Sequence, residues 1–207
     1  MREDAKQTGA YVKRQISRML NSGNESRVKA DLAHLRRGIG RVPGSMPELW
    51  EITLAGLPEN LMSKDGNPTK AEWAVHTALT LFALHQQGKN LKTACMDQEG
   101  SGLGAAVGRL VKKEDDLPRI KRRFDAAATA DSPAEFAHHL RGLIQIMRAE
   151  GIPLDYRALA RDLYFYQFQD ARDGVRLRWG QDFYKQIFRG KEQPEADENK
   201  KDGDKGE

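Results

Sequence analysis

The chain has 207 residues, of which 39% are apolar and 31% are charged, so it is long enough to bury one sizeable core. Its single cysteine, Cys95, excludes an internal disulfide, and the lack of an apolar run behind the charged N-terminus predicts a cytoplasmic protein without signal peptide or membrane anchor. The formal net charge is +4, but residues 191–207 hold four Lys against seven Asp or Glu, which leaves +7 (30 − 23) on residues 1–190 and favours polyanionic partners.

Two amphipathic helices are predicted at the start of the chain, the first over about residues 4–20. Asn24 can cap the second helix, which we expect to end at Arg37. Its apolar stripe consists of Val28, Leu32 and Leu35. Arg36 lies beside that stripe and Arg37 a further 100° round the helix, so this helix presents a basic flank.

A loop rich in Gly and Pro follows over residues 38–50 and leads into a short helix. Ser45 is the expected cap of this short helix, Pro47 suits its first turn, and Trp50 is expected to anchor it in the core. Because glycine lets the backbone approach a ligand closely, this loop and its Arg41 can lie against a phosphate backbone.

The least charged part of the chain is a helix predicted over about residues 69–87. Thr69 and Glu72 form a capping box at its start, and Gly88 supplies a left-handed residue at its end. Residues 73–87 contain no Asp, Glu, Lys or Arg, and their apolar side chains go most of the way round the helix. The run is too short to span a bilayer, so we interpret it as a helix of the protein core. We therefore predict an all-α protein, an irregular helical bundle packed around this central helix.

The glycines of residues 100–110 do not form a nucleotide-binding loop, because neither the phosphate-loop motif nor a preceding strand is present. We predict instead a helix capped by Ser101 that buries every third or fourth residue. The buried residues are Leu103, Val107 and Leu110, and the basic residues of the opposite face are Arg109, Lys112 and Lys113. A further helix starts at Asp116, and its inward residues are surrounded by Arg119, Lys121, Arg122 and Arg123.

Three more helices are predicted over residues 132–150, 156–168 and 178–188. Ser132 and Asp155 cap the first two of them, and Gly151 ends the first. Arg141 and Arg148 lie seven residues apart on the outer face of that first helix. We therefore expect one helical domain over residues 1–190. The remaining residues, 191–207, have no apolar side chain larger than alanine and are predicted to be a disordered acidic tail.

No catalytic, metal-binding or cofactor-binding constellation is present in the sequence. His138 and His139 are adjacent and point about 100° apart on a helix, and no pair of histidines has the spacing of a metal site. Cys95 has no local signature of a nucleophile, and Asp115 with Asp116 is best read as a helix cap. The sequence therefore predicts no enzyme, cofactor or metal.

Basic flanks recur on four predicted helices and one loop. The candidate nucleic-acid-binding residues are Arg27, Arg36, Arg37, Arg41, Arg109, Lys112, Arg122, Arg123 and Arg141. An ordinary solvated surface interleaves both signs of charge, whereas several of these flanks lack acidic neighbours in the sequence. Arginine outnumbers lysine 19 to 15, as bidentate phosphate recognition favours. The pattern indicates contact with a nucleic acid.

Four separated segments resemble the CasB family, the small subunit of the type I-E CRISPR surveillance complex, Cascade. The segments are LRRGIGRVPGSMPELW at 35–50, EWAVHTALTLFALHQQG at 72–88, HHLRGLIQIMRAEGIPLDYRALARDLY at 138–164 and VRLRWGQDFY at 175–184. They follow one another in the family's order over roughly residues 5–190.

The resemblance implies a non-enzymatic, all-helical subunit in antiviral defence, present in two copies beside the backbone and large subunits. Such a subunit holds the displaced non-target DNA strand, stabilising the R-loop, and supports the hybrid of guide crRNA and target DNA. The LRRG match implies strand contacts by Arg36 and Arg37, and the HHLRG match adds Arg141. The other candidates depend on the charge argument alone. Two alternatives stay open, a free-standing nucleic-acid-binding adaptor and an enzyme whose site is assembled from distant residues.

Overall fold

The computed structural model describes residues 1–192, and this part of the chain contains nine α-helices, two short 3₁₀ helices and no β-strand. The all-α prediction is confirmed. The helices are α1 (Arg2–Leu20), α2 (Glu25–Arg37), α3 (Trp50–Thr53), α4 (Lys70–His85), α5 (Leu103–Gly108), α6 (Asp116–Ala128), α7 (Pro133–Glu150), α8 (Tyr156–Tyr166) and α9 (Gln169–Glu192). From residue 193 onward, the predicted acidic tail lies outside the described residues.

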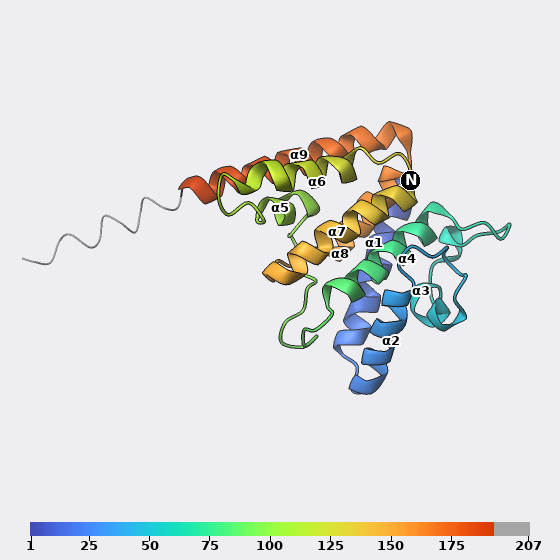
Figure 1. Cartoon of the computed structure of the whole chain (residues 1–207). Coiled ribbons are helices and arrows are strands. Elements are labelled where there is room, and N and C mark those ends of the chain that lie inside the picture. The colour runs from blue at the N-terminus through green and yellow to red at the C-terminus, as the bar shows by residue number, and fades with distance from the viewer. Residues whose placement is uncertain (193–207) are drawn as a thin grey trace, which may run out of the picture.

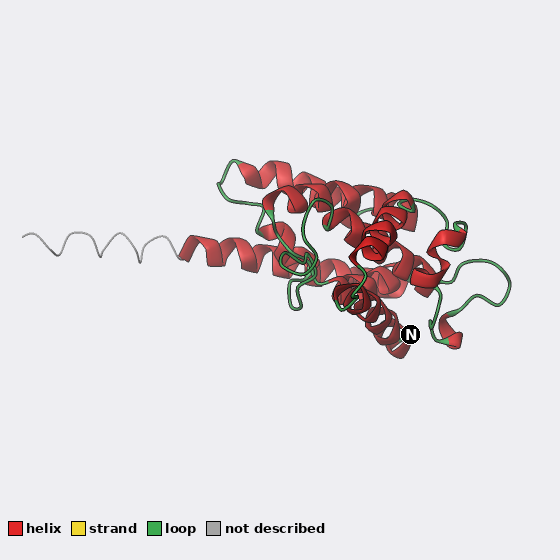
Figure 2. Ribbon diagram, turned by 90° about the horizontal axis from the view of Figure 1, so that it is seen from below, coloured by secondary structure: helices red, strands yellow, loops and turns green. Residues whose placement is uncertain are grey.

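The helices are arranged in two groups (Figure 1). In the first group α4 packs against α1, α2, α7 and α8. In the second group α5 and α6 lie along α9, and α6 also packs against α7. Figure 2 shows the same helices from below, with the last turns of α9 extending past the others. No helix in the described part is long and apolar enough to cross a membrane.

The central helix is α4, and 14 of its 16 residues are buried. The predicted capping box is present, because the Thr69 hydroxyl accepts a hydrogen bond from the Glu72 amide (3.1 Å) and the Glu72 carboxylate accepts one from the Thr69 amide (2.7 Å). Gly88, with φ of 80°, supplies the left-handed residue just after the helix. Burial on all sides explains why this stretch of sequence carries no formal charge after Glu72.

Two buried histidines connect α4 to its neighbours. The Nε2 atom of His76 donates to the Gly38 carbonyl (2.8 Å), which follows α2. The Nδ1 atom of His85 lies 3.0 Å from the Tyr156 hydroxyl of α8. That hydroxyl also lies 3.3 Å from the Leu81 carbonyl oxygen, to which it can donate. Burial lowers the pKa of both side chains, that of His85 to about 4.

The short helix after the glycine loop differs from the prediction in two respects. Trp50 is not a core anchor, because it is 50% exposed and its Nε1 atom donates to the Gly44 carbonyl at 2.8 Å. Leu49 and Ile52 fill the core instead, since they lie on the inward side of this segment. Ser45 is not the cap either, because its hydroxyl donates to the Val42 carbonyl within the preceding turn.

The last helix is much longer than predicted, at 24 residues from Gln169 to Glu192 in place of residues 178–188. Its buried stripe of Val175, Trp179 and Phe183 recurs every fourth residue, but charged residues and Gly174 conceal its first turns in the sequence.

The glycines of α5 permit close packing on α9. A Cβ atom on Gly104 would lie 2.1 Å from the Trp179 carbonyl oxygen, and one on Gly108 would lie 2.9 Å from the Phe183 carbonyl oxygen. Ser101 is not the cap of this helix, which begins after Gly102; its hydroxyl donates to the Pro153 carbonyl at 2.8 Å. The glycine-rich sequence is therefore explained by packing between helices.

Gly104→Ala is expected to destabilise the protein by at least ~1–3 kcal/mol, because the added methyl group meets backbone atoms that cannot move aside. The matched control is Gly180→Ala in α9, whose new Cβ would meet nothing within 4 Å. This control is expected to stabilise the helix by about 0.5–1 kcal/mol. Urea unfolding of both variants measures the difference, and equal stabilities would contradict the close packing of α5 on α9.

Stability is expected to fall as the pH drops from 6.5 towards 4, because His85 stays neutral in the folded protein while its unfolded form takes up a proton. A shift from the ordinary value of 6.5 to about 4 corresponds to about 3 kcal/mol, and His76 contributes in the same direction. Unfolding measured across this range should show a weaker pH dependence for His85→Gln. His138→Gln, which alters an exposed histidine, is the control and should behave as the wild type.

Candidate nucleic-acid interface

Helix α7 presents a polar stripe to solvent over residues 138–148. Its opposite side is buried through Phe136, Leu140, Leu143, Ile144 and Met147. Spacings of three, four and three residues place the stripe on one face, which consists of His138, Arg141, Gln145 and Arg148. The stripe is about 15 Å long, from ten residues at 1.5 Å each. Ser132 and Gly151 fix the two ends of α7, because they cap this helix as predicted.

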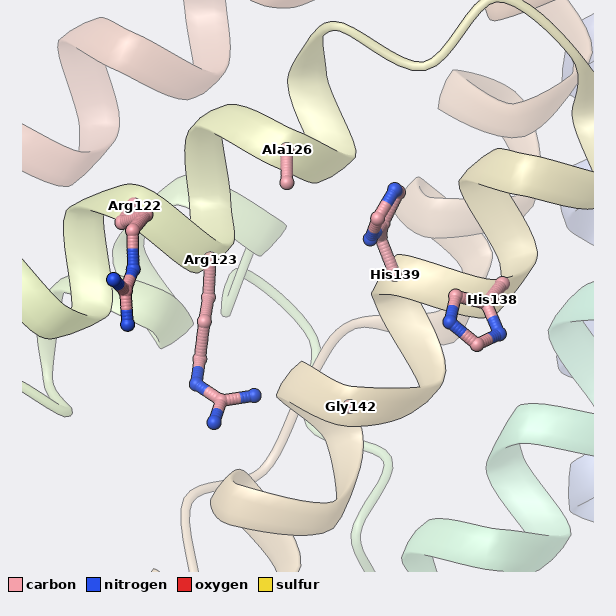
Figure 3. Close-up of a pocket in the computed structure, with 6 residues that line it drawn as sticks. All are labelled: Arg122, Arg123, Ala126, His138, His139 and Gly142. Carbon is pink, nitrogen blue, oxygen red and sulfur yellow. The ribbon is translucent and has the colours of Figure 1, made fainter.

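The first turns of this stripe form one wall of a cleft of about 350 Å³ between α6 and α7 (Figure 3). Arg122 and Arg123 extend from α6 into the space beside α7, and His139 points back towards α6. The Arg123 Nη1 atom would lie 3.9 Å from a Cβ atom on Gly142, an ordinary van der Waals distance, so the Arg123 guanidinium lies over this glycine. No described carboxylate lies within ion-pair distance of Arg122, Arg123 or Arg141, all of which are exposed.

The far end of the stripe meets the ends of α2 and α4. Arg148 donates to the Gln87 side chain (2.7 Å), and Arg36 reaches the Ala83 carbonyl oxygen (3.5 Å). Burial, and secondarily the charge of Arg148, lower the pKa of Arg36. Both cations lie by the C-terminus of α4, where the helix dipole favours positive charge. Arg37, the next residue of α2, is exposed and has no ion-pair partner among the described residues.

We call these residues together the basic track. It runs from α6 across α7 to the end of α2, and it consists of Arg122, Arg123, His138, Arg141, Arg148, Arg36 and Arg37. Five of the nine residues proposed from sequence lie on it. Arg148 was missed as a site residue, although its spacing of seven from Arg141 is the signal that places it on the same face.

The other four predicted residues have different environments. Arg27 pairs with Glu51, and Lys112 pairs with Glu150. Arg109 donates to the Ser101 hydroxyl and, at 2.9 Å, to the Pro153 carbonyl, and its burial lowers its pKa. Its guanidinium is thereby bound to the loop before α8, although Arg109 and Lys112 line the same pocket. Arg41 is exposed on the glycine loop beyond the track, without a described ion-pair partner.

Comparisons with known proteins agree on one family. A sequence profile of the CRISPR-associated protein Cse2 matches residues 31–184. The crystal structure of CasB from Thermobifida fusca is 34% identical with a TM-score of 0.71, covering 86% of this chain and 98% of its own. The crystal structure of M. ruber CasB is 19% identical with a TM-score of 0.65, covering 88% and 97%, and supports the fold alone. A search among curated protein sequences gives no match.

Arg109 is expected to contribute to stability, unlike the exposed Arg123 of the basic track. Arg109→Ala removes the donor to Ser101 and Pro153 and should cost about 1–3 kcal/mol, since partly buried acceptors lose a charged partner. Arg123→Ala, which removes an exposed side chain without an ion-pair partner, should change stability by less than about 0.5 kcal/mol. Denaturant unfolding of the two variants tests this, and a large loss for Arg123→Ala would make it structural.

Proposed function

This chain belongs to the family of the CRISPR-associated protein Cse2, and on that premise we propose that it is a non-catalytic small subunit of a type I-E CRISPR surveillance complex. In this function it binds the displaced non-target DNA strand and supports the hybrid of crRNA and target DNA, which stabilises the R-loop. Its partners are the backbone and large subunits and a second copy of itself, in the cytoplasm.

The observation that carries this proposal is the convergence of the basic track from three helices. Arg36, Arg123 and Arg148 are far apart in the sequence, yet α7 connects them, because Arg148 acts electrostatically on Arg36 and His138 of the same helix lines the cleft with Arg123. Surface arginines of this kind meet phosphate oxygens and do not distinguish bases. In RNA-guided complexes base pairing supplies sequence recognition, so a supporting subunit needs a surface that binds any sequence.

The proposal includes that this subunit has no catalytic activity of its own. Among the described residues, no group of three or more His, Cys, Asp or Glu side chains is placed to hold a metal ion. The buried histidines of α4 bond to Gly38 and Tyr156, which gives them structural roles. The alternative, a free-standing adaptor, uses the same surface. Co-purification with guide RNA and a backbone subunit from the native source distinguishes the two, because an adaptor would purify without them.

The double variant Arg123→Ala with Arg141→Ala is expected to shorten the R-loop lifetime in the assembled complex without changing which targets are chosen. In titrations of single-stranded DNA with the isolated protein, each lost phosphate contact should reduce the slope of log K against log salt by about 0.7. The fold should be intact, because both side chains are exposed.

A matched control is Arg27→Ala with Lys112→Ala, which removes the same two charges from positions that already pair with Glu51 and Glu150. This control should leave the R-loop lifetime near that of the wild type. If the two double variants have equal effects, net charge alone governs binding and the basic track is not the site.

A further inference from the structure

Helix α9 carries an uncovered apolar stripe on its outer face. Leu177, Tyr184 and Phe188 are 62%, 42% and 61% exposed, and they account for three of the six exposed large apolar side chains in the described residues. Their spacing of seven and four residues puts them on one face, opposite the buried stripe of Val175, Trp179 and Phe183. The Tyr184 ring packs edge-on against the core residue Phe183 at a centroid distance of 5.2 Å, yet all three side chains stay exposed in the described part of the chain.

The two aromatic residues of the stripe form a pair. The ring centroids of Tyr184 and Phe188 lie 6.5 Å apart, and their planes differ by 29°, so the rings are nearly parallel. Lys185 and Arg189 follow them on the same helix, exposed and without an ion-pair partner among the described residues. Aromatic faces bordered by positive charge are the combination that binds single-stranded nucleic acid, because bases stack on the rings and phosphates meet the cations.

Helix α6 joins this stripe to the basic track. The Phe124 ring packs against Trp179 and Phe183, at centroid distances of 6.5 and 5.3 Å, which fixes α6 beside α9. Lys121 lies close enough to Tyr184 for the two to interact electrostatically, whereas Arg123 lies over Gly142 of α7. Three consecutive basic residues, 121–123, therefore cross the outer surface of α6 from the aromatic pair to the cleft. That crossing is about one helix diameter, ~10 Å.

We propose that Tyr184 and Phe188 are a stacking platform for unpaired bases of a single strand whose phosphates lie on the basic track. This inference rests on the proposed function and extends it, because stacking on the two rings would make the surface prefer a displaced single strand over a duplex. In a duplex the base faces are stacked on one another, so only unpaired bases are free to stack on these rings. The bordering cations favour this occupant over the apolar surface of another protein, which depletes charge at its centre.

The test uses the full chain and two oligonucleotides of equal length, one normal and one with abasic sites throughout. Tyr184→Leu with Phe188→Leu keeps the stripe apolar and removes the rings. Because stacking contributes about 1–3 kcal/mol per base, this variant should bind the normal strand at least about fivefold more weakly. Binding of the abasic strand should be unchanged. Tyr184→Phe with Phe188→Tyr, which keeps both rings, should bind as the wild type does.

Several results would overturn the platform. One is equal binding of normal and abasic strands by the wild type, and another is a leucine variant that keeps the wild-type preference for bases. A third is a leucine variant whose sedimentation shows altered self-association with unchanged base preference, which would make the stripe a protein interface.

A different pattern of binding would show that the basic track is not the phosphate-binding site. Arg123→Ala with Arg141→Ala should weaken binding of normal and abasic strands alike, because both strands carry phosphates. If that variant binds both strands as the wild type does while the leucine variant loses the preference for bases, the track is wrong and the platform stands.

Discussion

The burial of α4 is the constraint on which the rest of the structure depends. A helix with 14 of 16 residues buried must be covered on every side, and α1, α2, α7 and α8 supply that cover. Its polar groups are satisfied inside the core, through His76 to Gly38 and through His85 to Tyr156. These bonds orient the end of α2 and the start of α8 as well as packing them. The position of Arg37, one residue before Gly38, follows from the first bond.

A second set of contacts positions α6 and α9 against α7 and α8, two of the helices that cover α4. Phe136 of α7, Tyr166 of α8 and Trp179 of α9 stack in one cluster, with centroid distances of 4.7, 5.5 and 5.6 Å. The Tyr166 hydroxyl also lies 2.8 and 2.9 Å from the Ala128 and Ala130 carbonyl oxygens at the end of α6, and its single proton is shared between these acceptors. Four helices are thereby held at one point. The cleft between α6 and α7 has its shape because this cluster fixes both of its walls.

The basic residues of this chain divide into two classes that the sequence alone does not separate. Arg27, Arg109 and Lys112 are committed to partners within the protein, and they hold loops and helix ends together. Arg123 and Arg141 have no described ion-pair partner; Arg123 lines the cleft beside α7, and Arg141 lies on the same face of α7 as Arg148. An arginine that already satisfies a carboxylate or a carbonyl contributes less to phosphate binding, because that bond must first be replaced.

Local physical rules were enough for much of the architecture. The sequence by itself determined the capping box at Thr69 and the caps at Asn24, Ser132 and Asp155, because a cap depends on neighbours within a few residues. It also determined the all-α class and the core position of α4, through helical periodicity and an uncharged run that only a buried helix would carry. The four matching segments also indicated the family, because they can be compared residue by residue without a structure. The exposed Trp50, the extra turns of α9 and the inward turn of Arg109 were decided by contacts with segments far along the chain. Charge patterns name candidate residues, but only packing between helices decides which of them share a surface and which already have a partner.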